Sequence, residues 1–137
     1  MCVLHVTSES SSFEGFLNTS SLPVYRSHEK GDISIHGKRQ PASDFGFSCT
    51  ISEKPWTDLA GQIEYAHEFV TRYSTELKTL SLNCVISDIR LDFPYSCRLD
   101  NQFFTQCDYL PAGFLRIVGE LGIGIELSHY PPHDQGS

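Results

Sequence analysis

The stretch CRLDNQFFTQCDYLP, residues 97–111, holds the side chains best suited to chemistry. Cys97 and Cys107 lie ten positions apart, with aspartates close by. A structural zinc ion would need about four converging thiolate or imidazole ligands, and the other candidates are Cys49, Cys84 and His129. No two cysteines have the C-x-x-C spacing of zinc ribbons and thioredoxin-like sites, and free cysteines are commonly buried without any metal. We therefore predict five reduced cysteines, no metal and no other cofactor.

Catalytic signatures are missing from the sequence as well. There is no G-x-S-x-G nucleophile motif and no Gly-rich phosphate loop. A pair such as Cys107 with His67 can be imagined, because proximity in the fold is invisible in a sequence. Four carboxylates suit general acids or hard-metal ligands, but equally strand ends and turns, the commonest place for aspartate: Asp88, Asp92, Asp100 and Asp108. We predict turns and no catalytic residue.

Composition narrows the classes of partner and the compartment. The chain has 137 residues and a net charge of −7, which argues against nucleic acid because phosphate binding needs a basic surface. No apolar run approaches the roughly 18 residues that span a bilayer. The opening MCVLHVTSESSS has no basic residue before a short apolar part, so we expect no secretory signal. Together with an odd number of cysteines, this predicts a cytoplasmic protein without a membrane partner.

Hydrophobic periodicity predicts the elements. Alternating or β-rich runs predict strands at residues 2–7, 45–52, 82–93, about 102–107 and 123–130, with a short one near Ile33 to Ile35. Amphipathic spacing predicts a short helix at 12–18, a helix of five to six turns from Pro55 to Leu80, and a helix at 110–122. Residues 19–44 are the least regular part, and residues 131–137 are expected to be a frayed tail.

This order of elements predicts one domain over residues 1–137 of the α+β class. The alternating strands and the amphipathic helices each have one apolar side. A single sheet with helices on one face buries the apolar sides of both. We therefore expect a two-layer sandwich. Its sheet would be mixed or antiparallel with five to six strands, covered by two main helices and one short helix.

Two passages resemble a bacterial family known only as domain of unknown function 4279. They are FSCTISEKPWTDLAGQIEYAHEFV and LDFPYSCRLDNQFFTQCDYLPAGFLRIVGELGIGIELSHYP, within residues 20 to 131. The shared features are a strand, a tryptophan-led helix, another strand, and a proline-led helix ending in ELG before a final strand. These motifs are structural, so the resemblance implies a small bacterial α+β domain and no active residue.

Small acidic bacterial proteins without catalytic signatures include many immunity proteins, which neutralise a toxin by covering it. By this analogy we predict a non-enzymatic protein-binding module for a basic toxin or effector domain. Residues 99–137 hold five acidic residues and one basic residue, a net charge of −4. The predicted contact residues form two patches: Asp92, Asp100, Asp108 and Tyr109 in one, Glu64 and Glu68 in the other. The alternative is a small-ligand-binding or metal-dependent enzyme that uses the carboxylates of residues 88–108. The sequence leaves the oligomeric state open.

Overall fold

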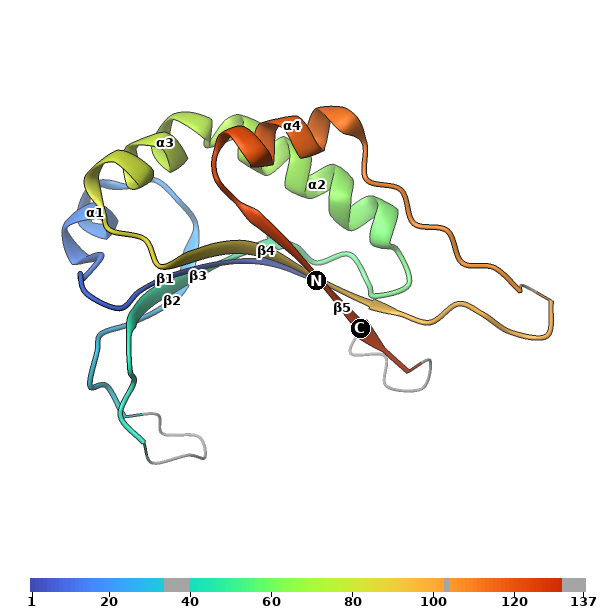
Figure 1. Cartoon of the computed structure of the whole chain (residues 1–137), viewed down its shortest axis with the longest axis horizontal. Coiled ribbons are helices and arrows are strands. Elements are labelled where there is room, and N and C mark those ends of the chain that lie inside the picture. The colour runs from blue at the N-terminus through green and yellow to red at the C-terminus, as the bar shows by residue number, and fades with distance from the viewer. Residues whose placement is uncertain (34–39, 103, 132–137) are drawn as a thin grey trace.

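A five-stranded mixed sheet forms one layer of the protein, and α2, α3 and α4 lie over one of its faces (Figure 1). The computed structural model describes residues 1–33, 40–102 and 104–131. In chain order the elements are β1 (Cys2–Ser8), α1 (Glu14–Thr19), β2 (Val24–His28), β3 (Phe45–Ser52), α2 (Leu59–Arg72), α3 (Ser74–Asn83), β4 (Asp88–Ser96), α4 (Ala112–Glu120) and β5 (Gly124–Tyr130). The predicted α+β two-layer sandwich is confirmed.

The sheet order is β2-β3-β1-β4-β5, with β4 and β5 parallel and the other neighbours antiparallel. Alternation along β1 buries Cys2, Leu4 and Val6 completely. Leu4 pairs with Cys49 of β3 on one side and Leu91 of β4 on the other, so one row of apolar side chains crosses the centre of the sheet. This face carries the core, because directly opposed residues share a face.

The predicted long helix is two helices in the structure. It begins at Leu59 instead of Pro55, because Asp58 caps it: the Asp58 Oδ1 accepts a hydrogen bond from the Gly61 N–H at 2.9 Å. It breaks at Tyr73, where φ is −101° and ψ is 18°. The buried stripe nevertheless continues across the break, from Ile63, Ala66 and Val70 to Leu77 and Leu80. The break changes the helix direction without interrupting the core.

The strand predicted at residues 82–93 is shifted in the structure. Residues 82 and 83 belong to α3, and β4 runs from Asp88 to Ser96, through the proline that was expected to end it. Pro94 is tolerated because β1 pairs with β4 only as far as Asp92, so no neighbour on that side requires its missing N–H. The Pro94 carbonyl accepts a hydrogen bond from the Gln62 Nε2 at 2.8 Å, which ties α2 to this end of β4.

The first half of the chain holds a strand that the sequence analysis missed. β2 pairs antiparallel with β3 and lies at the edge of the sheet. The short strand expected near Ile33 to Ile35 lies mostly outside the described residues; Ile33 itself forms an isolated bridge to Pro41. The tail expected to fray from residue 131 lies outside them from residue 132 on. The strand predicted around 102–107 is wrong, because none of the residues described there is in a strand.

No helix within the described ranges is both long enough and apolar enough to span a membrane.

Candidate functional site

Residues 97–111 connect β4 to α4, and we call this segment the arm; none of its described residues is in a helix or strand. Figure 1 shows the arm extending well beyond the sheet and helices before it returns to α4. Connections longer than about 12–15 residues without secondary structure are uncommon in compact domains, and those that occur are usually functional or disordered. The stretch with the side chains best suited to chemistry is therefore also one of the two long connections of the fold, the other being residues 29–44 between β2 and β3.

A set of hydrogen bonds joins the two legs of the arm near its base. The Arg98 guanidinium forms an ion pair with Asp108. The Arg98 backbone N–H donates to the Gln106 Oε1 at 2.7 Å, and the Gln106 Nε2 donates to the Asp108 Oδ2 at 3.1 Å. The Cys97 N–H donates to the Tyr130 carbonyl at 3.1 Å, which anchors the first leg to the end of β5. These contacts connect the two legs to each other and to β5 near the base of the arm.

The arm presents large apolar side chains to solvent. Phe104 is 87% exposed and Tyr109 is 78% exposed, and Leu99 is also exposed. Single exposed apolar residues are ordinary on protein surfaces, so it is the number of them on one projecting segment that makes the arm a candidate binding surface. Aromatic side chains supply much of the binding energy in protein–protein interfaces.

A cavity of about 440 Å³ lies between the arm and α2. It brings together residues from both predicted patches: Glu64 from α2, and Asp108 and Tyr109 from the arm. A second hollow continues along α2 and is bordered by Glu64, Glu68 and Arg72. The two patches are thus one surface at this point, with exposed carboxylates on the helix and an aromatic side chain on the arm.

The other predicted contact residues lie apart from this cavity. Asp92 is on the face of the sheet opposite the described helices, where its Oδ1 accepts a hydrogen bond from the Ser128 Oγ at 2.7 Å. Asp88 is on the same face and is paired with Arg90. Asp100 belongs to the arm, and its Oδ1 accepts a hydrogen bond from the Gln102 N–H at 2.7 Å. The carboxylates of residues 88–108 therefore divide between the sheet and the arm.

Metal-ligating side chains do not cluster in the described part of the chain. No group of three or more His, Cys, Asp and Glu residues there could hold a metal ion. His67 and Cys107 do border the same cavity, and the His67 ring lies 5.9 Å from the Phe114 ring, centroid to centroid. His129 stacks on Tyr95 at 4.9 Å between centroids.

The cysteines differ strongly in burial, which predicts their reactivity. Cys2 and Cys49 are completely buried, and burial raises the pKa of both thiols, that of Cys49 to about 12. Because the thiolate is the reactive form, neither should react with iodoacetamide at pH 7.5 in the native protein. The exposed Cys107 should react first.

Mass spectrometry of the alkylated native and denatured protein tests this prediction. Five modified cysteines are expected after denaturation without reductant, and rapid native modification only outside Cys2 and Cys49. Rapid native labelling of Cys49, or a mass two units low before alkylation, would contradict it.

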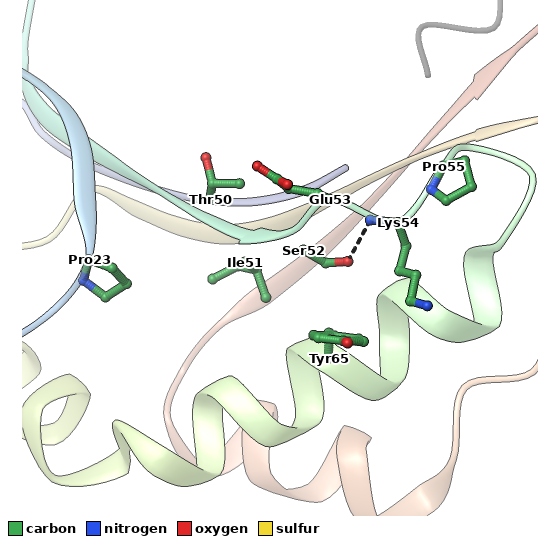
Figure 2. A pocket seen from close by; sticks show the side chains of 8 residues that line it. All are labelled: Pro23, Thr50, Ile51, Ser52, Glu53, Lys54, Pro55 and Tyr65. Atoms are coloured by element: carbon green, nitrogen blue, oxygen red, sulfur yellow. Dashed lines mark hydrogen bonds between the residues drawn. The ribbon is translucent and has the colours of Figure 1, made fainter.

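Two features of the surface were not foreseen. The first is a polar row on the sheet face opposite the described helices, where the His5 Nδ1 lies 3.0 Å from the Ser48 Oγ. The second is a cavity of about 650 Å³ at the end of β3, bordered by Lys54 and Tyr65 (Figure 2). Neither has a sequence signal, because the first depends on which strands are neighbours and the second on how α2 lies against the end of β3.

No protein-family model matches the chain, and a search of curated proteins and of solved structures found no significant match.

Proposed function

We propose that the protein is a non-enzymatic binding module that neutralises a basic toxin or effector domain by covering it. The observation that carries the proposal is the arm, which presents Phe104 and Tyr109 to solvent and brings Tyr109 to a cavity that Glu64 of α2 also borders. The aromatic side chains act as anchors in apolar pockets of the partner. Glu64, which borders the same cavity as Tyr109, and Glu68 on the next turn of α2 meet basic residues of the partner.

Charge supports this assignment of partner. The net charge of −7 and the exposed carboxylates on α2 produce a negative potential that attracts a basic surface and raises the association rate. Asp108 contributes less to this potential than the sequence suggests, because Arg98 balances its charge. In the proposal, Asp108 keeps the two legs of the arm together through its contacts with Arg98 and Gln106. The arm is then already ordered in the free protein, and binding costs little conformational entropy.

The proposal also includes a bacterial, cytoplasmic setting. The resemblance to family 4279 implies bacterial origin, and the five cysteines suit a reducing compartment. Both stay predictions. An immunity protein acts inside the cell that makes the toxin, so a cytoplasmic setting agrees with the proposed function.

The test begins with capture of the partner and then measures association. The chain serves as bait in a pull-down from a source bacterium, and mass spectrometry identifies the partner. The association rate, measured by stopped flow, should fall about tenfold or more between 20 and 150 mM salt. At the higher salt concentration the Debye length is only about 8 Å, so the negative charges no longer attract the partner from a distance. The double variant Glu64→Lys/Glu68→Lys should slow association at low salt in the same way.

Glu14→Lys is the matched control, because Glu14 is exposed on α1, which lies at the far end of the molecule from the arm in Figure 1. This single charge reversal should change the logarithm of the association rate by less than half of the change that the double variant produces. An association rate that is independent of salt and unchanged by the double variant would refute the proposed electrostatic recognition.

A further inference from the structure

β3 has an edge that its neighbour covers only in part. β2 pairs with β3 from Gly46 to Cys49, and the chain leaves this edge at Pro23. No described strand pairs with Thr50–Ser52 on that side, although β1 continues along the other side to Ser52. A strand edge of this kind presents backbone N–H and C=O groups that an extended peptide can pair with.

The cavity of about 650 Å³ lies at this open edge. Figure 2 shows Ile51 and Lys54 pointing toward Tyr65 of α2, while Thr50 and Glu53 point the other way. The side chains on the α2 side of the cavity are thus Ile51, Tyr65 and Lys54, together with Ser52, whose Oγ accepts a hydrogen bond from the Lys54 N–H at 3.0 Å. Tyr65 is 47% exposed, so an incoming side chain could cover its ring.

The cavity is lined by one basic and one acidic residue, Lys54 and Glu53, and only Lys54 points toward α2 in Figure 2. The Lys54 Nζ lies 5.6 Å from the centre of the Tyr65 ring, which holds the ammonium over the cavity. Within the described residues no carboxylate forms an ion pair with it. Glu53 points away from it in Figure 2. The site is thus suited to a ligand with one carboxylate and one apolar side chain.

The open edge is short and is bounded at both ends. Pro23 lies at one end of the cavity and Pro55 at the other, as Figure 2 shows. A strand that continued past Ser52 would meet Pro55, which has no N–H to pair with it. The edge therefore has room for about three residues of extended chain at roughly 3.3 Å each, which fits a chain terminus better than the middle of a strand.

We propose that this groove binds the free C-terminus of an extended peptide that ends in an apolar residue. The peptide pairs with the backbone of Thr50–Ser52, its last side chain covers Ile51 and Tyr65, and its carboxylate meets the Lys54 ammonium. The site is separate from the arm. Tyr65 and His67 are two positions apart on α2, and residues at that spacing do not face the same side of a helix.

The test titrates the full, isotope-labelled chain with one defined probe by NMR. The probe is an acetylated hexapeptide, GSGTVL, with a free C-terminal carboxylate, and its control is the same peptide as the C-terminal amide. The carboxylate form should shift the amide signals of Thr50, Ile51 and Ser52. The amide form should bind about fivefold more weakly, the factor that one partly exposed ion pair supplies.

Lys54→Met keeps the apolar stem of the side chain and removes the charge. It should weaken binding of the carboxylate peptide about fivefold and leave binding of the amide peptide unchanged. Lys78→Met, on α3, should change neither. The proposal is overturned if both peptides bind equally to the wild type, if Lys54→Met binds the carboxylate peptide as the wild type does, or if millimolar peptide leaves Thr50–Ser52 unshifted.

Discussion

Ile63→Asp should unfold the protein at room temperature. Ile63 is 3% exposed and belongs to the stripe of α2 that packs on the sheet. An aspartate at this position would place a carboxylate in an apolar layer without a partner. Burial of an unpaired charge costs several kcal/mol, and a domain of this size has only about 5–15 kcal/mol of stability to lose. Circular dichroism melting and urea titration measure the change.

Ala60→Asp is the matched control, because it adds the same carboxylate to an exposed position of α2. An acidic residue in the first turn of a helix is well placed for the helix dipole, so its stability should change by no more than about 0.5 kcal/mol. Equal melting curves for Ile63→Asp and the wild type would contradict the packing of α2 on the sheet.

The elements with strong periodicity could be predicted from the sequence. The bounds of β3 at Phe45–Ser52 were predicted correctly, and those of β5 were one residue off at the first position. In both, one set of alternate residues is apolar, and this pattern identifies a strand wherever it is placed in the sheet. The apolar stripe of the long helix was predicted from its own periodicity, apolar residues at steps of three and four. Ser74 and Thr75 marked a place where this helix could end, and the structure has the break at Tyr73, although the apolar spacing continues across it.

Elements that depend on tertiary neighbours could not be predicted. β2 contains Arg26 and other polar residues, and its burial pattern shows no buried position, so it resembles a loop in the sequence. It is a strand because β3 offers a free edge beside it. The segment at 102–107 is the reverse case: a strand was predicted there, and none of its described residues is in one. Its aromatic residues resemble a strand, but no strand of the described sheet lies next to it.

Most residues of the candidate site were named from the sequence, but which of them lie together in the fold was not predicted. Asp108, Tyr109, Glu64 and Glu68 were named as members of two alternative patches, and the structure places Glu64, Asp108 and Tyr109 around one cavity. Asp92 belongs to the sheet face instead, because strand alternation places it opposite the core. Phe104, which is 87% exposed on the arm, was not named as a site residue, since an aromatic residue in a predicted strand is expected to be buried.

Phe104→Ser should weaken binding to the captured partner about tenfold to hundredfold. The side chain is 87% exposed in the free protein, so its removal costs the fold little, whereas the proposal has it fill an apolar pocket of the partner. Loss of a buried aromatic anchor acts mainly on dissociation, since orientation and charge set the encounter. The free energy of unfolding should stay within about 0.5 kcal/mol of the wild type.

The dissociation rate of the complex is therefore the most direct measurement of the central claim, that the arm is the binding surface. It is compared for the wild type, Phe104→Ser and Leu82→Ser, where Leu82 is an equally prominent apolar residue, 84% exposed, on α3. The account predicts dissociation about tenfold or more faster for Phe104→Ser, and unchanged for Leu82→Ser. Equal dissociation rates for Phe104→Ser and the wild type, with both proteins folded, would contradict it.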